Sequence, residues 1–470
     1  MSQEGRLAVV GARIVDAATG RDEVGTCVLD DGVIADVGPD VGVPAGADVI
    51  EAEGFALLPG LVDPHVHIPR AGRERTTAHE MLVRAGVTTA VEFADFRGVL
   101  AQWTASAAGL TVLGLQAVPP LVEPITDARA RAEVEVALDA GAVGIKILGG
   151  HYPCSPEASA QLVAAADELG AYVAFHAGTT AHGSNLQGME EAIALAEGRP
   201  FHLAHTNAYL RGAVDDPLAE NLRALRLLRE HPEIRSEAHL APLNACFGGL
   251  VDGEPRDHIV RNCLALRGYP PVAEGMEKAF LDGYAHVHSE TSRGIELVTG
   301  AAGLAAWRDS PDGGMLSFPV NLRLSAYLQT CARVGPAGGL AFEGPGDFVV
   351  DAICSDGGTW RNVIVDQGLT LVHLGALTLL DFVRKASWHP ARMFGLQRKG
   401  TLSRGADADV ALVDLERRQV RTTIAAGRVV YDGTTATGTG GTVLTTERGA
   451  GAVAAHGVPH RVLDPAPRCS

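Results

Sequence analysis

The sequence lacks paired cysteine motifs, long apolar runs and any excess of basic side chains. Its 7 cysteines include no CxxC pair, which argues against a disulfide framework and against a cysteine zinc site, so reduced thiols and a cytoplasmic location are expected. No run of about 18 apolar residues occurs and the N-terminal segment lacks the pattern of a secretory signal, so we expect no membrane partner. Lys and Arg total 39 against 56 for Asp and Glu. Because phosphate contacts need clustered cations, this balance argues against nucleic acid as a partner.

What the sequence does contain is enough apolar material for a large core. Of the 470 residues, 46% are apolar and 20% are charged, a composition typical of globular proteins. This length allows two or three domains, or one large barrel with a smaller companion domain.

Both ends of the chain have the pattern of short strands. Residues 6–57 and 407–433 alternate apolar and polar positions and are interrupted by Gly, Asp and Pro turn signals. We therefore predict one small β-sandwich domain built from residues 1–57 and 399–435. Residues 436–470 are rich in Gly and Thr and are predicted to form an extended tail.

The middle of the chain, residues 58–398, has a different rhythm, in which short apolar runs alternate with amphipathic helical stretches. One such stretch, 155–170, begins with Ser155 as a candidate N-cap and Pro156 at the first helical position. Eight apolar runs separated mostly by helices predict an α/β fold of the (β/α)₈ TIM-barrel type. The runs are 57–67, 88–93, 111–118, 143–148, 171–176, 201–205, 234–240 and 348–356. An insertion around 241–347 interrupts the pattern, and we interpret it either as a lid or as a loosely packed loop with some helix.

The motif DPHVH at 63–67 is the first candidate for chemistry. Residues two apart on a strand point to the same face, so His65 and His67 aim at one point. A lone histidine on such a strand would usually be structural. Two at this spacing, at the end of an early apolar strand, favour a metal site.

Lys146 is the second candidate, because it lies in the middle of the apolar run VGIKIL. A buried ammonium is costly, and the structural alternative is a lysine that reaches solvent or pairs with a carboxylate. Unlike arginine, a buried lysine can lose its proton. The neutral amine can react with carbon dioxide to form a carbamate, whose two oxygens can bridge two metal ions.

Three further candidates follow later predicted strands: His176, His205 and Asp356. His202 competes with His205, which we prefer because it lies at the end of its apolar run. An Asp before two glycines is ordinarily a turn residue, but in a barrel with four inward histidines we interpret Asp356 as a metal-linked carboxylate and general base. All would converge on the C-terminal mouth of the barrel, where barrel active sites lie.

The order HxH, Lys, His, His and Asp on strands one, four, five, six and eight resembles the binuclear, carboxylated-lysine branch of the amidohydrolase superfamily. The likeness extends over roughly 5–435, and the segment 388–414 resembles the closing helix and return strand of that family. GIKIL is similar to hydantoinases, dihydropyrimidinases and dihydroorotases, which open cyclic amides. The segment 141–176 and the motif SDGG resemble N-acyl-D-amino-acid deacylases, whose bridging Cys has no counterpart in 86–96. Gly357 and His151 stand where hydantoinases have His and Tyr.

The resemblance implies a metal-dependent amidohydrolase that cleaves a non-peptide C–N amide bond of a small molecule, either a cyclic, hydantoin-like amide or an N-acyl amino acid. It implies metal-activated hydroxide as nucleophile, with Asp356 as base and then acid, and a homo-oligomeric assembly. Two divalent metal ions, expected to be Zn²⁺, would be held by His65, His67, Lys146, His176, His205 and Asp356. Lys146 would be carboxylated by CO₂.

Contacts to the substrate are less strongly indicated by the sequence. Arg70, His151 and Tyr152 follow candidate metal ligands and are proposed to bind substrate, against a solvated or packing role for each. Two alternatives stay open for the function. One is a mononuclear metal-dependent deaminase of a heterocycle, which would have no use for a carbamate at Lys146. The other is a non-catalytic scaffold that keeps the fold.

Overall fold

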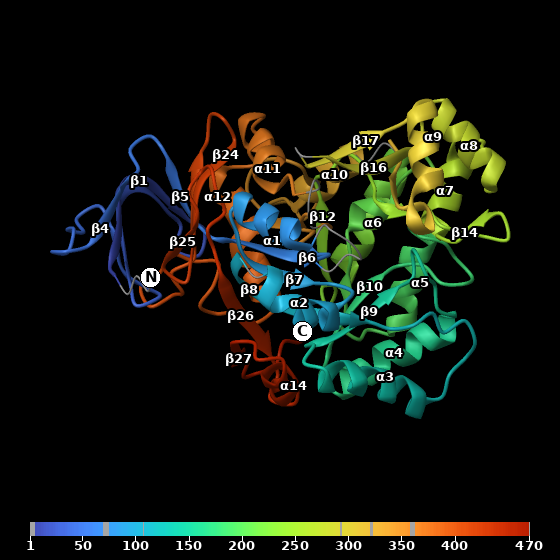
Figure 1. Cartoon of the computed structure of the whole chain (residues 1–470), viewed down its shortest axis with the longest axis horizontal. Coiled ribbons are helices and arrows are strands. Elements are labelled where there is room, and N and C mark those ends of the chain that lie inside the picture. The colour runs from blue at the N-terminus through green and yellow to red at the C-terminus, as the bar shows by residue number, and fades with distance from the viewer. Residues whose placement is uncertain are drawn as a thin grey trace.

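Two large sheets of different construction organise the computed structural model, which describes residues 5–68, 75–106, 108–291, 294–319, 323–357 and 362–469. Both ends of the chain contribute to an eight-stranded sheet, and the middle forms a barrel of parallel strands. Figure 1 shows the β domain at one end of the long axis and a helical insertion at the other, with the barrel between them.

The β domain joins the two ends of the chain at one strand pair. β5 (Ala56–Pro59) is antiparallel to β23 (Val410–Asp414), with Leu57 opposite Leu412. Leu57 and Leu412 belong to a separate apolar cluster under this sheet, as do Ile14 and Leu29. The small β domain predicted from both termini is thereby confirmed. Its remaining strands are β1 (Leu7–Asp16), β2 (Arg21–Asp30), β3 (Val33–Gly38), β4 (Asp48–Glu51), β24 (Gln419–Ala425) and β25 (Arg428–Tyr431).

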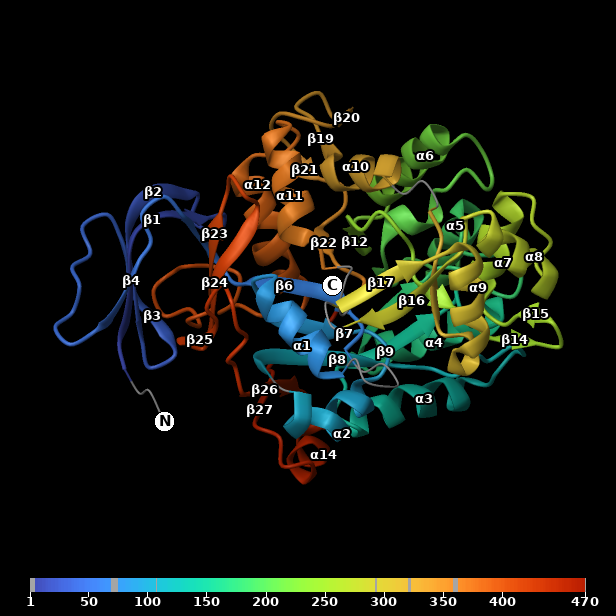
Figure 2. The ribbon, with the colours of Figure 1, turned by 45° about the horizontal axis from the view of Figure 1, so that its top comes forward.

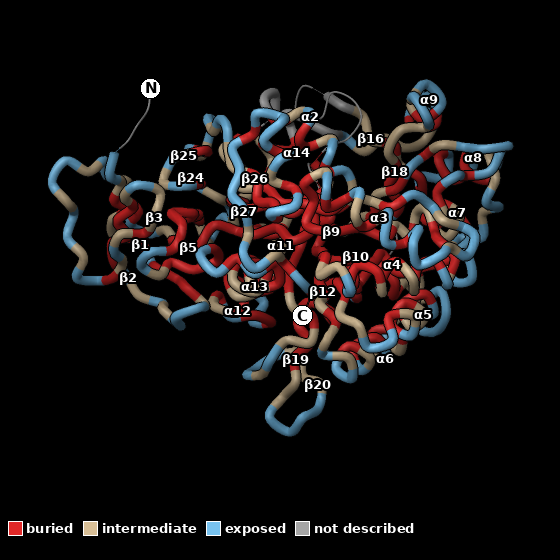
Figure 3. Tube along the Cα trace, turned by 90° about the horizontal axis from the view of Figure 1, so that it is seen from below, coloured by how far each residue is buried: buried red, intermediate tan, exposed pale blue. Residues whose placement is uncertain are grey.

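The barrel contains all eight predicted strands in chain order. They are β6 (Leu61–Val66), β7 (Val87–Glu92), β8 (Ala108–Ala117), β9 (Gly144–Leu148), β10 (Tyr172–His176), β11 (His202–Leu203), β12 (Arg235–His239) and β22 (Ala352–Cys354). Successive strands pair in parallel from β6 to β22. The amide of Asp356 donates to the carbonyl oxygen of His65 at 3.0 Å, which brings the end of the last strand against the first. Both faces of such strands are covered, which explains their nearly continuous apolar runs. Figure 3 shows the resulting buried centre around β9, β10 and β12.

Helices between the strands cover the outside of the barrel, and their starts follow local capping chemistry. In α4 (Pro156–Glu168) the Ser155 hydroxyl accepts a hydrogen bond from the amide of Ala158, as the sequence predicts. In α3 (Asp127–Asp139) Thr126 has the same role. Other helices on the barrel are α1 (Arg75–Arg84), α2 (Phe96–Ser106), α5 (Leu186–Ala196), α6 (Pro217–Glu230), α11 (Ile364–His373) and α12 (Leu379–Val383).

The insertion between β12 and β22 is a folded unit with its own core. A four-stranded antiparallel sheet contains β13 (Cys246–Phe247), β18 (Met315–Ser317), β16 (His286–Thr291) and β17 (Gly294–Val298). Three helices accompany it: α7 (His258–Leu266), α8 (Ala273–Leu281) and α9 (Gly300–Asp309). Phe280, Leu316 and Phe318 are fully buried in an apolar cluster of this unit. The insertion is therefore not a loosely packed loop, and Figure 2 shows it on the side of the barrel away from the β domain.

The C-terminal segment differs from the predicted extended tail. It contains β26 (Gly440–Thr445), α14 (Ala450–Ala455) and β27 (His460–Val462). β26 pairs in parallel with β8, Val443 opposite Val112, and both side chains are fully buried. β26 thus takes the first part of the β8 edge whose later part, from Leu115 on, pairs with β9, and a few apolar side chains accompany this pairing in a segment that is otherwise rich in Gly and Thr. Within the described ranges, no helix is long and apolar enough to cross a membrane.

Candidate functional site

The C-terminal ends of the barrel strands bring the six predicted ligands together. His65 and His67 come from the end of β6, Lys146 from β9 and His176 from the end of β10, while His205 and Asp356 follow β11 and β22. Ligand atoms of His65, His205 and Asp356 all lie within 4.8 Å of one another.

Two imidazoles of this group converge on one carboxylate oxygen. Oδ1 of Asp356 lies 3.3 Å from Nε2 of His65 and 3.4 Å from Nε2 of His67. The rings of the two histidines are 5.1 Å apart, as expected for side chains on the same face of one strand. Three ligand atoms that converge in this way can share one metal ion.

Two of the site residues have an unusual backbone conformation. Asp356 has φ 52° and His205 has φ 31°, in the left-handed region that non-glycine residues rarely occupy. Such strain persists where the surrounding structure demands it and clusters at functional sites. Here the two strained residues lie at the ends of two barrel strands, where the backbone turns and presents the side chain to the mouth of the barrel.

Lys146 is the most buried cation of the site. Its side chain is fully enclosed, and Nζ has no hydrogen-bond partner in the part of the chain that the structure describes. The centroid of the Phe93 ring lies 4.6 Å from Nζ. Burial lowers the pKa of Lys146 to about 8, although the charges of Glu237 and Asp356 oppose this. A buried amine of lowered pKa, with no hydrogen-bond partner among the described residues, meets the requirement for reaction with carbon dioxide.

His176 and His205 form the other side of the group, with ring centroids 4.4 Å apart. Nε2 of His176 lies 2.9 Å from the hydroxyl oxygen of Ser184. Burial holds the pKa of His176 well below its usual value, with His205 adding to the effect. Gly150 fits closely against the ring, because a Cβ there would lie 1.8 Å from Nε2 of His176. The imidazole is therefore neutral, which is the form that binds metals, and glycine is required beside it.

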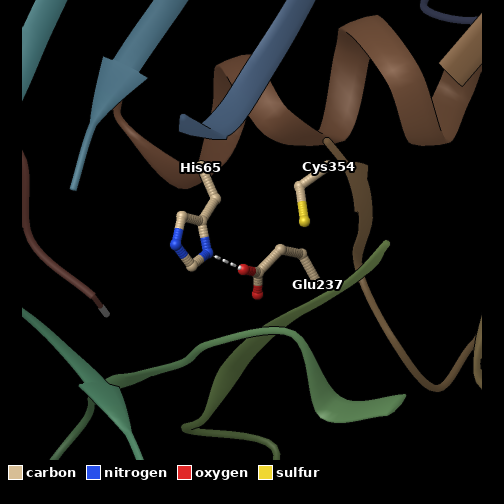
Figure 4. Close-up of side chains that lie close together, drawn as sticks. All are labelled: His65, Glu237 and Cys354. Atoms are coloured by element: carbon tan, nitrogen blue, oxygen red, sulfur yellow. Dashed lines mark hydrogen bonds and ion pairs between the residues drawn. The ribbon is translucent and has the colours of Figure 1, made fainter. Parts of the chain in front are cut away.

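Glu237 on β12 is a functional residue that the sequence analysis missed. Its buried carboxylate accepts hydrogen bonds from Nδ1 of His65 at 2.6 Å and from Nε2 of His202 at 2.9 Å, as well as from the backbone amide of His205 at 2.9 Å. Figure 4 shows the bond to His65, with Cys354 close by. Burial by itself would raise the pKa of Glu237, but the charge of His202 and the hydrogen bonds to His202 and His65 hold it well below its usual value. Because Nδ1 of His65 donates to Glu237, Nε2 is left as the acceptor that faces Asp356.

The same bonds resolve the choice between His202 and His205. His202 lies deeper in the barrel, between Glu237 and the hydroxyl of Tyr172, which is 2.9 Å from its Nδ1. His205 lies beside His65 and Asp356. An acid in the strand IRSEAHL is the signal that could have pointed to Glu237, by the argument applied to Lys146.

Glu92, at the end of β7, was also missed. Its carboxylate accepts hydrogen bonds from the backbone amides of Ile68 at 2.5 Å, Ala94 at 2.8 Å and Asp95 at 3.0 Å. Oε1 lies 4.0 Å from Nδ1 of His67. Burial raises the pKa of Glu92 to about 7 in spite of these bonds. Glu92 thus ties the backbone that follows the HxH motif to the end of the neighbouring strand.

The predicted substrate contacts have different positions. Nδ1 of His151 lies 2.9 Å from a carboxylate oxygen of Asp257 in the insertion, and its ring is 5.1 Å from that of His176. Tyr152 stacks on Phe247 of the insertion at 5.9 Å between ring centroids. The structure therefore places His151 beside the cluster and packs Tyr152 against the insertion. Arg70 lies outside the described residues.

Three comparisons with known proteins show what this chain is similar to. A model of the amidohydrolase family matches residues 56–221 and 347–430. A dihydroorotase of Geobacter metallireducens is 22% identical over 446 residues, covering 87% of this chain and 89% of its own length. The N-acyl-D-glutamate deacylase of Bordetella bronchiseptica, solved with zinc and a phosphonate inhibitor, superposes with a TM-score of 0.64 at 17% identity and covers 98% of this chain and 100% of its own. The dihydropyrimidinase of Brevibacillus agri gives a TM-score of 0.56 at 17% identity, covering 92% and 96%. The two solved structures share the fold of this chain.

Proposed function

The chain belongs to the amidohydrolase family, hydrolases of C–N bonds other than peptide bonds, and from this premise we propose that it cleaves an amide of a small molecule at a centre of two divalent metal ions. The family membership confirms the resemblance predicted from the sequence. The observation that carries the proposal is the convergence of His65 and His67 on Asp356, with the buried amine of Lys146 in the same site.

The donor set fits the metal ions that the proposal requires. Neutral imidazoles, a carboxylate and a lysine able to become a carbamate are ligands that suit Zn²⁺. We propose that the ions are held by His65, His67, carboxylated Lys146, His176, His205 and Asp356. Ions bound there would polarise the amide carbonyl and lower the pKa of water.

Two residues of the chain have distinct roles in this proposal. Asp356 takes the proton from the attacking water and delivers it to the departing nitrogen, acting as base and then as acid. His151, held through Nδ1 by Asp257, directs its other ring nitrogen towards the substrate carbonyl. Arg70 and Tyr152 remain predicted substrate contacts.

Lys146 weighs against the mononuclear deaminase. A buried amine without a hydrogen-bond partner among the described residues is costly, and a site that used only one ion would leave it without a purpose. The presence of all six candidate ligands weighs against a non-catalytic scaffold.

The names of the relatives span cyclic and open-chain amides, so the substrate proposed here is either a cyclic amide or an N-acyl amino acid. The test is a panel assayed with zinc-loaded protein: ring opening of hydantoins and dihydropyrimidines, beside amine release from N-acyl D- and L-amino acids. We expect turnover of at least one class and its loss after treatment with a chelator. Turnover that survives chelation, or ammonia released from a heterocycle in place of amide opening, would contradict the proposal.

Two further proposals concern the location and the assembly of the protein. We propose a cytoplasmic location, in keeping with seven cysteines that are all buried thiols. We also propose a homo-oligomer, which sedimentation of the purified protein would test.

A further inference from the structure

A line of hydrogen bonds leads from the candidate metal centre into the interior of the barrel. It begins at His65, whose Nδ1 donates to Oε1 of Glu237 at 2.6 Å. Oε2 of Glu237 lies 2.9 Å from Nε2 of His202, and Nδ1 of His202 lies 2.9 Å from the hydroxyl oxygen of Tyr172. None of the four residues is more than 1% exposed. Because Tyr172 is the first residue of β10, the line ends far from the mouth, near the opposite end of the barrel.

The segment after β27 meets this line at Tyr172. Cys469 is only 3% exposed, and its thiol donates to the carbonyl oxygen of Val173 at 3.4 Å. Burial raises the pKa of this thiol to about 12, and hydrogen bonds, one of them with the side chain of Tyr172, oppose the rise. The thiol and the phenol are therefore in contact. Figure 3 shows the C-terminal end of the chain beside β10, in agreement with these contacts.

The direction of each bond in the line follows from the chemistry of its partners. Glu237 is ionised and can only accept, so Nε2 of His202 is a donor. A neutral imidazole that donates from Nε2 accepts at Nδ1, where the hydroxyl of Tyr172 is the donor. Burial raises the pKa of Tyr172 well above its usual value, so the hydroxyl keeps the proton that it donates. The ring of His202 is thus held by Glu237 on one side and by Tyr172 on the other.

Aromatic packing fixes the rings of the line in place. The ring of Tyr172 stacks on Phe394, with centroids 4.6 Å apart. The ring of Phe93 meets His202 edge-on at 5.1 Å and stacks on His65 at 4.1 Å. Because protein interiors are close-packed, a displaced ring in this group would also displace its neighbours.

The carboxylate of Glu237 transmits the position of His202 to His65. Its Oε2 accepts from Nε2 of His202 and from the backbone amide of His205, each at 2.9 Å. With Oε2 held by these two donors, the carboxylate cannot turn, and Oε1 stays opposite Nδ1 of His65. Loss of the donor on His202 would leave Oε2 with the backbone amide alone.

We propose that His202, Tyr172 and Cys469 are positioning residues, which act through Glu237 to hold His65 in its metal-binding orientation. The inference rests on the proposed metal centre and gives the segment after β27 a part in metal binding. Partners behind a metal-bound imidazole fix its tautomer and raise its basicity. In this chain that support extends through three further side chains, as far as the C-terminal segment. A satisfied polar network also stabilises a core, so the effect that distinguishes positioning is a change in metal affinity.

The first test is Tyr172→Phe, which removes only the hydroxyl group. Zinc affinity, measured by competition with a chromophoric chelator, should fall about 3- to 10-fold, less than for loss of a direct partner of the ligand. Tyr284→Phe is the matched control, because its hydroxyl donates to the carbonyl oxygen of Cys263 at 2.8 Å within the insertion. The control should lower the stability of the protein and leave zinc affinity unchanged. An equal loss of zinc affinity in both variants would overturn the inference.

Two further positions test the line at its middle and at its end. His202→Gln keeps an amide that can donate to Glu237, so it should retain more zinc affinity than His202→Leu. Cys469→Ala removes the thiol that contacts Tyr172, and zinc affinity should fall in the same direction as in Tyr172→Phe. Equal affinities in the two His202 variants would overturn the role of that ring, and wild-type affinity in Cys469→Ala would overturn the role of the C-terminal segment.

A double-mutant cycle tests whether the effect passes through Glu237. In the Glu237→Gln background, Tyr172→Phe should have little further effect on zinc affinity, because the carboxylate that transmits it is already absent. Equal fold-losses in the wild-type and Glu237→Gln backgrounds would show that Tyr172 acts independently of Glu237 and would overturn the inference.

A measurement on the metal-free protein separates this inference from the proposed function. With ¹⁵N-labelled histidine, the Nδ1 proton of His65 reports its bond to Glu237 by NMR, and its resonance should move in Tyr172→Phe. If the resonance moves but the wild type binds no zinc, the proposed centre fails and the positioning role stands. If the wild type binds zinc while neither the resonance nor the affinity changes in Tyr172→Phe, the positioning role alone is wrong.

Discussion

Replacing Glu237 by Gln should weaken metal binding without touching a ligand. The carboxylate of Glu237 accepts from two imidazoles and one backbone amide, at 2.6, 2.9 and 2.9 Å. A glutamine has one carbonyl oxygen, which can keep the bonds to His202 and His205, and its NH₂ group then faces Nδ1 of His65. That ring must either lose the contact or move its proton to Nε2, the atom that faces Asp356.

The size of the effect follows from the bond that is lost. A hydrogen bond to a charged group contributes about 1.5–3 kcal/mol, so the unfolding free energy of the metal-free protein should fall by about that amount. Removing the partner that orients a metal-bound imidazole typically costs about 10- to 100-fold in metal affinity. Urea denaturation and competition with a chromophoric zinc chelator measure the two quantities. Glu230→Gln, at the exposed end of α6, is the matched control. An unchanged zinc affinity in Glu237→Gln would refute the orienting role assigned to Glu237.

Three other perturbations test separate parts of the site. Lys146 has a pKa of about 8 in the folded chain against 10.5 in the unfolded chain, so between these pH values only the unfolded chain carries the extra proton. The metal-free wild type should therefore become more stable relative to Lys146→Met as the pH rises from 8 to 10.5. The expected gain in the free energy of unfolding, measured by urea denaturation, is about 3 kcal/mol. A flat difference would show that Lys146 is not desolvated. In Gly150→Ala the added methyl would meet Nε2 of His176 at 1.8 Å, so metal content should fall while circular dichroism keeps its barrel signature; full metal content would argue against the close approach. Asp356→Asn should lower kcat about 10²- to 10⁴-fold, and wild-type turnover in steady-state assays would remove Asp356 from the mechanism.

The barrel was predictable because each of its strands is a short apolar run between turn signals and helices. The histidines, Lys146 and Asp356 could be found for a related reason, since each is a polar residue within or just after such a run. Glu237 was missed because its partner His65 is 172 residues away and nothing local distinguishes its role. The pair of His151 and Asp257, 106 residues apart, depends in the same way on where the insertion packs.

Order outside the barrel was harder to predict from local patterns. β26 pairs with the part of the β8 edge that β9 does not reach, about which the Gly- and Thr-rich segment itself holds no information. The insertion has a core of its own, but its strands are short and its helices come from separate stretches, so no regular period indicates it.

The central claim is a metal centre that depends on a carboxylated Lys146. The most direct test is metal analysis of wild type and Lys146→Ala, both purified with zinc and bicarbonate and both assayed with the substrate that the panel identifies. The account predicts about two ions per chain in the wild type, with metal content and turnover falling together in Lys146→Ala. A single ion per chain in the wild type, with turnover unchanged in Lys146→Ala, would contradict it.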